Sequence, residues 1–211
     1  MPTPNELRAL YQTQAAWFAA ERNRLLRKAG IARCRRVLDL GTGTGELLEN
    51  LDLRAAGFAI GADADIRVLR FARGKRVACD ARMMPFANAT FDLVFTQMFF
   101  LWAKPLDTVL SEIRRVLADN GCLVAAAEPD YGGAIEHPSR SQEIQKIADE
   151  LRAEGADVRI GRKLAQAMDR TGFQVECGIH PADPLANGPG QPFQFTPYFH
   201  FVAKRSESGN H

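Results

Sequence analysis

Residues 37–45 constrain the fold more than any other part of the sequence. They read Val-Leu-Asp-Leu-Gly-Thr-Gly-Thr-Gly, so a short apolar run leads into three glycines at alternate positions. The apolar residues are typical of a buried parallel strand, while Gly41, Gly43 and Gly45 allow a sharp turn and a close approach to a ligand. The pattern predicts a helix that begins at Gly45 and points its free amide groups at that ligand. A strand followed by such a loop indicates an α/β fold with a cofactor site, and a tight turn without a ligand is the alternative.

A second acidic residue follows at the end of the next predicted strand. Residues 58–62 are apolar and lead to Asp63, which lies 22 residues after Gly41. A carboxylate about 20 residues past such glycines can accept hydrogen bonds from both hydroxyls of a ribose. Asp65 is predicted to cap the helix that follows. The reverse assignment, with Asp65 at the ribose, is the alternative.

Three more strands are predicted before residue 130. Residues 76–79 form a short third strand that ends at Asp80, and residues 91–96 form a fourth. A helix over residues 105–118 has apolar residues at helical spacing, and a fifth strand is predicted at residues 121–128. Asp80 either contacts a cofactor or caps a turn, and the residues alone leave both interpretations open.

The glycine spacing separates two classes of cofactor site. Dinucleotide-binding loops read G-x-G-x-x-G, whereas this loop reads D-x-G-x-G-x-G from Asp39 to Gly45. It resembles the first motif of the class I S-adenosylmethionine-dependent methyltransferases. The resemblance continues through Phe-Asp-Leu-Val at residues 91–94 and Leu-x-x-x-Gly-x-Leu at residues 117–123. It covers residues 35–128 with the motifs in the right order.

The resemblance implies a three-layer Rossmann-like α/β fold. Its seven-stranded sheet is expected in the order 3-2-1-4-5-7-6, with the last strand antiparallel. The resemblance also implies S-adenosylmethionine as the cofactor, S-adenosylhomocysteine as its product, and an acid followed by a small residue at the adenine, matched by Asp80 and Ala81. The predicted cofactor-binding residues are Asp39, Gly41, Thr42, Gly43, Gly45, Asp63, Ala64, Asp80, Ala81 and Gln97.

The amino-terminal part of the chain is predicted to lie on the substrate side. Residues 3–6 read Thr-Pro-Asn-Glu, which fits a capping box with proline at the first helical position, so a helix is predicted over residues 4–28. In similar small-molecule methyltransferases an N-terminal helix covers the cofactor pocket as a lid, and Tyr11, Trp17 or Phe18 could line it. Plain packing against the domain is the alternative for each of these aromatic residues.

The loop over residues 129–138 is expected at the mouth of the pocket, because open α/β sheets bind ligands beyond the carboxyl ends of their strands. If the methyl acceptor has to lose a proton, His137 is the first candidate for the general base, with Tyr131 or Asp130 behind it. A turn-stabilising role is the alternative for each. Helices are predicted over residues 139–154 and 160–171, strands over 173–180 and 195–204, and a disordered tail over 206–211.

Length and composition favour a single enzyme domain over residues 1–205. At 211 residues and 46% hydrophobic content the chain can bury a sizeable core. The expected division is a lid at residues 1–30, a cofactor-binding core at 35–128 and a substrate side at 129–205. No apolar run approaches the roughly 20 residues that span a bilayer, and no secretory signal is apparent, so a cytoplasmic location is expected.

The net charge and the spacing of potential metal ligands limit which partners are expected. A net charge of +2, from 27 basic and 25 acidic residues, makes a nucleic-acid partner unlikely. A basic run within residues 22–36 is expected to be a solvated helix face, with binding of a phosphate-bearing substrate or RNA as the alternative. The four histidines and four cysteines are not clustered along the chain, so no metal site is predicted.

The function predicted from the sequence is transfer of a methyl group by in-line displacement to an unidentified small-molecule acceptor. Such a reaction depends mainly on alignment and on exclusion of water. The first alternative is a catalytically inactive protein that binds S-adenosyl nucleosides and regulates a partner. An NAD-dependent oxidoreductase is the second alternative, and the glycine spacing argues against it.

Overall fold

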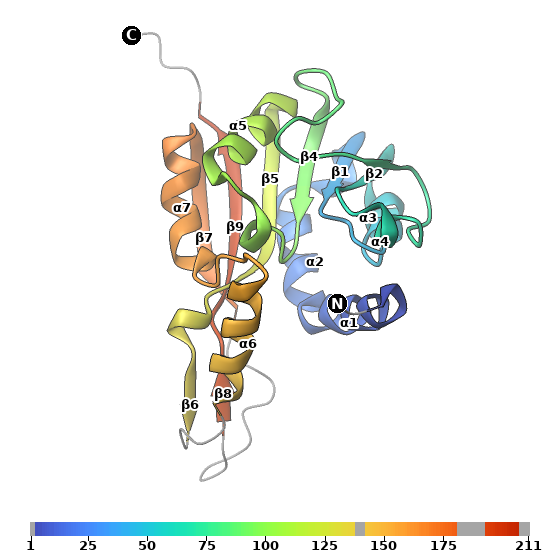
Figure 1. Ribbon diagram of the computed structural model, residues 1–211. Coiled ribbons are helices and arrows are strands. Elements are labelled where there is room, and N and C mark those ends of the chain that lie inside the picture. The colour runs from blue at the N-terminus through green and yellow to red at the C-terminus, as the bar shows by residue number, and fades with distance from the viewer. Residues whose placement is uncertain (1–2, 138–141, 181–192, 207–211) are drawn as a thin grey trace.

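A seven-stranded sheet forms the centre of the molecule (Figure 1). The structure is a computed structural model that describes residues 3–137, 142–180 and 193–206. The strands are β1 (Arg36–Leu40), β2 (Phe58–Asp63), β3 (Arg76–Ala78), β4 (Phe91–Thr96), β5 (Leu117–Pro129), β7 (Phe173–Ile179) and β9 (Tyr198–Arg205). Their order is β3-β2-β1-β4-β5-β9-β7. Among the described strands of this sheet, β9 alone runs antiparallel, to both β5 and β7, so the predicted order 3-2-1-4-5-7-6 is confirmed.

Helices cover both faces of this sheet, because successive strand residues point to opposite sides. Val37 packs into one apolar cluster with α2 (Ala19–Lys28) and α3 (Leu48–Arg54). Leu38 packs into the other cluster, with α5 (Leu106–Val116) and α7 (Ile160–Arg170). The buried residues of α5 lie three and four positions apart, which gives that helix one apolar face toward the sheet. The three-layer Rossmann-like architecture is therefore confirmed.

The amino-terminal helix is broken, whereas the sequence predicted one helix over residues 4–28. The structure has α1 (Pro4–Trp17) and α2, with Phe18 between them in a non-helical conformation. The capping box of Thr3 and Glu6 is present. The break follows from packing, because the Phe18 ring lies 4.8 Å from the ring of His180 and 4.7 Å from that of Tyr198. Helical periodicity carries no information about such a contact.

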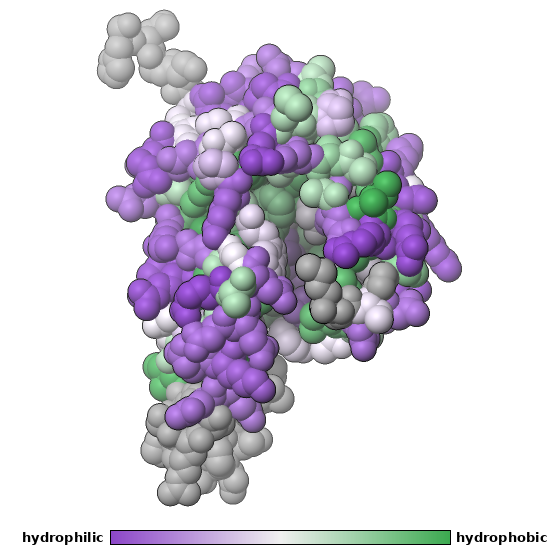
Figure 2. Space-filling view, viewed as in Figure 1, coloured by the Kyte–Doolittle hydropathy of each residue, from purple (hydrophilic) through white to green (hydrophobic). Residues whose placement is uncertain are grey.

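An arm extends beyond the carboxyl ends of the central strands (Figure 1). It contains the short turn η3 (Tyr131–Gly133), a two-stranded sheet of β6 (Ile135–His137) and β8 (Phe193–Phe195), and α6 (Glu143–Ala153). The sequence predicted residues 129–138 as a loop and residues 195–204 as a single strand, and both predictions are corrected here. Pro197 separates β8 from β9, because proline supplies no backbone N–H for a sheet ladder. In Figure 2 the described surface of the arm is mostly hydrophilic.

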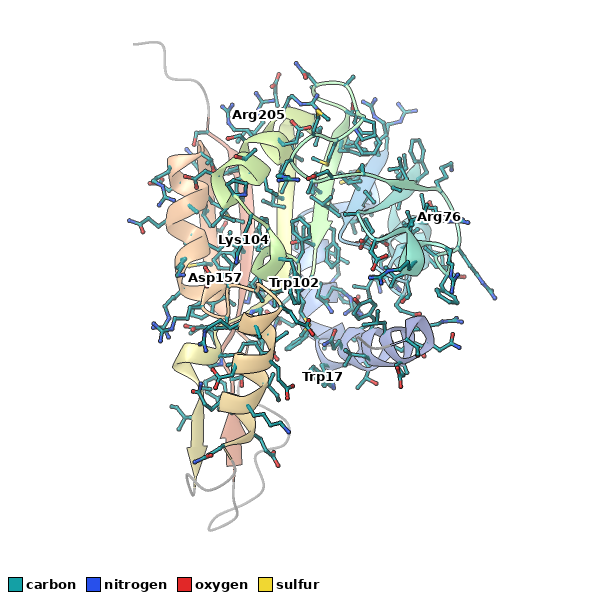
Figure 3. The ribbon with its side chains drawn as sticks, viewed as in Figure 1. Trp17, Arg76, Trp102, Lys104, Asp157 and Arg205 are labelled. Carbon is teal, nitrogen blue, oxygen red and sulfur yellow. The ribbon has the colours of Figure 1, made fainter. Side chains whose placement is uncertain are left out.

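The remaining elements are short. They are η1 (Ile31–Arg33), α4 (Ile66–Leu69) and η2 (Phe100–Trp102). The backbone amide of Asp157 donates to the carbonyl of Leu101 over 2.7 Å, and Lys104 donates to the carbonyl of Gly155, so η2 is fastened to the α6–α7 connection (Figure 3). None of the described helices is long and apolar enough to cross a membrane. Most of the predicted tail, residues 207–211, lies outside the described residues.

Candidate functional site

The glycine loop after β1 has the conformation that its sequence predicted. Gly41, Gly43 and Gly45 adopt φ angles of 77°, 54° and 78°, in the left-handed region that favours glycine. The amide groups of Gly41 and Thr42 donate to the carbonyl of Ala62, over 2.8 and 3.1 Å, which holds the loop against the end of β2. The helix does not begin at Gly45 as expected, because a turn intervenes and α3 begins at Leu48.

Asp63 lies at the carboxyl end of β2, as predicted, and is joined directly to the glycine loop. Its carboxylate accepts hydrogen bonds from the amides of Gly43, over 2.8 Å, and Asp65, over 2.9 Å. The amide of Ala64 also hydrogen-bonds to this carboxylate. Burial raises the pKa of Asp63, and these amide donors oppose the rise. Asp65 accepts from the amide of Arg67 and caps α4, which agrees with its predicted role.

Asp39 and Thr42 form the buried floor of the loop. The Thr42 hydroxyl donates to the Asp39 carboxylate over 2.6 Å. Asp39 is 3% exposed, and burial raises its pKa to about 7, with the hydrogen bond from Thr42 opposing the rise. Asp39 therefore fixes the turn from beneath, while Asp63 and the backbone amides form its upper side.

Arg22 belongs to this site, and the sequence did not reveal it. Its side chain is 7% exposed and donates from Nη1 to the carbonyl of Ala15, over 2.7 Å, and to Oε1 of Gln97, over 3.2 Å. Its Nε is buried without a partner, and Arg22 forms no ion pair within the described parts of the chain. The sequence predicted a solvated basic run here, but Arg22 lies on the inner face of α2, within electrostatic range of Asp39.

Asp80 and Ala81 follow β3 at the same edge of the sheet. The Asp80 carboxylate accepts from the amide of Arg82 over 2.8 Å and pairs with its guanidinium, which lowers the pKa of Asp80 to about 2. The Asp80 side chain is 45% exposed. The turn-capping interpretation is thus present in the structure. It leaves this carboxylate charged and open to solvent.

Aromatic side chains cover the glycine loop. A Cβ atom placed on Gly43 would lie 2.9 Å from Cε2 of Tyr11, and one on Gly41 would lie 2.6 Å from Cδ2 of Phe99. Tyr11 comes from α1, so this helix lies against the loop, and its role as a lid stays a prediction. Trp17 and Trp102 are about half exposed, at 54% and 45%, and lie beyond the same end of the sheet (Figure 3).

Glu128 at the end of β5 is a second residue whose role the sequence did not indicate. It is fully buried, and its two carboxylate oxygens accept from the amides of Phe99, over 3.2 Å, and Phe100, over 3.0 Å. Burial raises its pKa to about 8. Glu128 therefore holds the segment that places Phe99 against Gly41. Its position directly after the apolar run of residues 122–127 was the signal in the sequence.

The three predicted catalytic residues occupy different environments. Asp130 is 3% exposed and accepts from Nε of Arg162 over 2.5 Å. Tyr131 is half-buried and hydrogen-bonds to the side chain of Tyr198, and burial raises its pKa. His137 lies on β6, opposite Phe193, and its side chain is outside the described part of the structure. Asp130 and Tyr131 are adjacent in space, whereas His137 lies farther along the arm.

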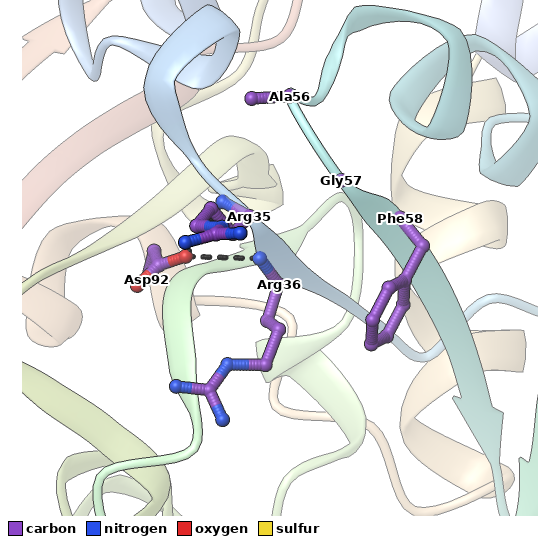
Figure 4. Close-up of a pocket in the computed structure, with 6 residues that line it drawn as sticks. All are labelled: Arg35, Arg36, Ala56, Gly57, Phe58 and Asp92. Atoms are coloured by element: carbon purple, nitrogen blue, oxygen red, sulfur yellow. Dashed lines mark hydrogen bonds between the residues drawn. The ribbon is translucent and has the colours of Figure 1, made fainter.

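An open pocket lies at the opposite ends of the strands, away from all of these residues (Figure 4). It is lined by Arg35, Arg36, Ala56, Gly57, Phe58 and Asp92. These residues lie at the amino ends of β1, β2 and β4. Open α/β sheets bind ligands at their carboxyl edge, so the pocket in Figure 4 is not the cofactor site.

Comparisons with known proteins agree with this geometry. A family model described as a methyltransferase domain matches residues 38–125. A malonyl-[acyl-carrier protein] O-methyltransferase of Geobacter sulfurreducens is 36% identical over 171 residues, which cover 71% of this chain and 62% of that protein. An uncharacterized protein of Methanocaldococcus jannaschii is 34% identical over 196 residues, which cover 80% of this chain and 75% of that protein.

The fold is also found among solved structures. A SAM-dependent methyltransferase from Aquifex aeolicus superposes with a TM-score of 0.67 over 96% of this chain and 99% of that chain, at 14% sequence identity. Five malonyl-[acyl-carrier protein] O-methyltransferases match in sequence, and this chain spans between 32% and 62% of their lengths.

Proposed function

Because the chain belongs to the class I S-adenosylmethionine-dependent methyltransferases, we propose that it methylates a carboxylate oxygen on a small or carrier-bound acyl acceptor. S-adenosylmethionine is the cofactor. The oxygen acceptor is supported by relatives that are named malonyl-[acyl-carrier protein] O-methyltransferases and are 32% to 37% identical over the matched segments. A carboxylate is already deprotonated at neutral pH, so its methylation requires no general base.

The hydrogen bond between the Gly43 amide and the Asp63 carboxylate is the observation that carries the proposal. It brings the glycine turn and the acid at the end of β2 into one site, in which two or more donors already hold the carboxylate in place. A carboxylate has about four lone-pair positions, and the amides of Gly43, Ala64 and Asp65 use three of them, so Asp63 retains capacity to accept from a ribose hydroxyl. Asp80 and Ala81 are assigned to the adenine, and the loop amides to the remainder of the cofactor.

Arg22 is assigned to the carboxylate of the methionine part of the cofactor. A buried guanidinium without an anionic partner is costly, and an anionic ligand removes that cost. The unpartnered Nε and the contact between Arg22 and Gln97 place the positive charge beside the end of β4, next to the loop. The residues present therefore fit S-adenosylmethionine at both its ribose and its amino-acid end.

The contribution of the chain to the reaction is alignment and exclusion of water. When bound, S-adenosylmethionine supplies an electrophilic methyl group on a sulfonium, and displacement leaves neutral S-adenosylhomocysteine. The loop and Asp63 fix the cofactor in position, while the rings of Tyr11 and Phe99 cover the glycines and keep water away. Glu128 holds the backbone of Phe99 and thus maintains this cover.

The segment after β5 is assigned to the acceptor. Asp130 is engaged by Arg162 and Tyr131 by Tyr198, so we assign these two residues to holding the backbone of this segment and not to acting as bases. The exposed side chain of Arg159 lies against Gly132, where it supplies positive charge for an anionic acceptor. His137 is retained as the general base for an acceptor that carries a proton.

Transfer of an isotopically labelled methyl group tests this proposal. The chain is incubated with labelled S-adenosylmethionine and either a malonyl thioester or the matched acetyl thioester, which lacks the free carboxylate. We expect label on the malonyl acceptor only, released as methanol by mild alkali because the product is a methyl ester. Label on neither acceptor, in a preparation that binds S-adenosylhomocysteine, would refute the proposed acceptor class but not cofactor binding.

A further inference from the structure

Three potential metal ligands converge outside the cofactor site. Glu21 comes from α2, His180 follows β7, and His200 lies on β9. One ligand atom from each lies within 4.8 Å of the other two, and Nδ1 of His200 is 3.9 Å from Oε1 of Glu21. The three residues are far apart in sequence, which is why spacing along the chain predicted no metal site.

The buried imidazole of His180 has one nitrogen bound and the other free. Its Nε2 contacts the carbonyl oxygen of Ala126, which can only accept a hydrogen bond, so Nε2 carries the proton. Nδ1 then presents a lone pair, and it is buried without a partner in a side chain that is 6% exposed. Histidine ligands of metals characteristically donate their second ring nitrogen to a backbone carbonyl in this manner.

The ring of His200 occupies the space that a side chain on Gly178 would fill. A Cβ atom on Gly178, its pairing partner on β7, would lie 2.7 Å from both Cε1 and Nε2 of the ring. The ring therefore fits only over a glycine. Its Nδ1 is also buried without a hydrogen-bond partner, on the side that faces Glu21.

Glu21 supplies the anionic ligand. Nε of Arg24 donates to both of its oxygens, each over 2.9 Å, and the Glu21 side chain is 20% exposed. The guanidinium holds the carboxylate from the solvent side and leaves lone pairs on the side of the histidines. Its positive charge competes with a cation, so we expect modest affinity and not the tight binding of a four-ligand structural site.

We propose that Glu21, His180 and His200 form a binding site for Zn²⁺. Two imidazole nitrogens and one carboxylate oxygen are a typical zinc donor set, whereas magnesium and calcium take oxygen ligands. Tetrahedral bonds of about 2.0–2.1 Å place ligand atoms about 3.3 Å apart, so small side-chain rotations close the observed cluster. Water completes the coordination. The Zn²⁺ ion gives a partner to Nδ1 of His180 and to Nδ1 of His200. It also links α2 to β9 and to the end of β7.

Isothermal titration of the untagged 211-residue chain with Zn²⁺ tests this site, together with thermal melting. We expect one equivalent to bind with a micromolar dissociation constant and to raise the Tm. Co²⁺ should give the intense visible absorption of a four-coordinate nitrogen and oxygen site. Glu21→Gln and His200→Ala should each weaken Zn²⁺ binding at least tenfold and abolish the rise in Tm.

Glu176→Gln is the matched control for Glu21→Gln. Glu176 also pairs with a cation of α2, Lys28, but it is 71% exposed and lies outside the cluster. Its variant should bind Zn²⁺ like the unsubstituted chain. Absence of Zn²⁺ binding by the unsubstituted chain, or equal affinity in the Glu21→Gln and Glu176→Gln variants, would overturn the proposal. Melting temperatures without metal report whether each variant is folded.

Discussion

At the residue scale, one carboxylate has two tasks. Asp63 accepts hydrogen bonds from the amides of Gly43 and Asp65, so it holds the glycine loop in place. The same carboxylate is assigned to the ribose of the cofactor. Sequence spacing predicted the ribose contact but not the bond to the loop, because the sequence does not show how closely the two segments approach. Substitution of Asp63 therefore affects both the shape of the loop and the contact with the ligand.

Asp63→Asn is predicted to weaken binding of S-adenosylhomocysteine by about 5- to 150-fold, or about 1–3 kcal/mol, as measured by calorimetry. The new amide group places a donor where a backbone N–H donates, and it removes the charge from the ribose acceptor. Asp92→Asn is the matched control, since Asp92 also accepts two backbone amides, those of Arg35 and Arg36, at the remote edge. Equal affinities in the two variants would contradict the ribose assignment.

Arg22→Met is predicted to weaken binding at the amino-acid end of the cofactor and to leave binding at the adenosine end unchanged. Loss of a charge-assisted contact should weaken binding of S-adenosylhomocysteine by about 10- to 150-fold. Affinity for methylthioadenosine, which lacks the amino-acid carboxylate, should stay within twofold of the unsubstituted chain. Arg27→Met, on the exposed face of the same helix, should change neither affinity. A parallel loss for both ligands in the Arg22 variant would assign Arg22 a structural role only.

The raised pKa of Glu128 is predicted to make the stability of the folded chain depend on pH. Burial raises its pKa from 4.5 to about 8, so between these values the folded chain holds a proton that the unfolded chain has released. Its contribution to the free energy of unfolding is fully present below about pH 4.5 and is lost as the pH rises through about 8. Asp39, with its pKa raised to about 7, acts in the same direction.

Denaturant titrations between pH 5 and 8 measure this effect. The unsubstituted chain should lose stability across this range, and Glu128→Gln, which has no proton to release, should show a shallower slope because only Asp39 and weaker groups remain. The slope is the informative quantity, since the substitution also changes the absolute stability. Identical slopes would mean that Glu128 is charged in the folded chain throughout this range.

At the element scale, α1 is loosely attached over the loop. Its side chains make long polar contacts to the rest of the molecule, with Nε of Arg8 and Nε2 of Gln12 each 3.4 Å from Oε1 of Glu46, and the shorter bond from Arg22 to the carbonyl of Ala15 lies near its carboxyl end. Leu10 and Trp17 of the same helix are about half exposed, at 46% and 54%. An element with few buried contacts opens at low free-energy cost, so α1 is suited to move when a ligand enters.

Hydrogen exchange of α1 amides is predicted to slow when S-adenosylhomocysteine binds, because the ligand adds contacts beneath Tyr11. The amides of α5 serve as the internal reference, because α5 packs in the apolar cluster with Leu38 and α7. They should exchange at an unchanged rate. Unchanged exchange across residues 4–17 at saturating ligand would show that α1 is not a lid.

Also at this scale, the sequence predicted regular elements more accurately than their interruptions. The helix over residues 105–118 and the strand over 91–96 appear as α5 and β4, because their apolar residues follow the period of the element. The break at Phe18 and the β6–β8 pair depend on contacts between segments that are distant in the chain. Local periodicity contains no information about such contacts.

At the scale of the whole molecule, the strand order and the cofactor class were implied by the family resemblance of the motifs at residues 39–45, 91–94 and 117–123. Arg22 could not be found in this way, since an arginine on a helix is normally solvated. Its role depends on which face of α2 meets the sheet. The cluster of Glu21, His180 and His200 likewise exists only after α2, β7 and β9 have come together.

Calorimetric titration with S-adenosylmethionine, S-adenosylhomocysteine and NAD(H), in parallel and on one preparation, tests the central claim most directly. The account predicts micromolar binding of both adenosyl ligands at one site per chain, and no heat from NAD(H). Binding of NAD(H) alone would contradict the account and favour an oxidoreductase. Absence of binding by all three ligands from a folded preparation would contradict the assignment of the glycine loop as a cofactor site.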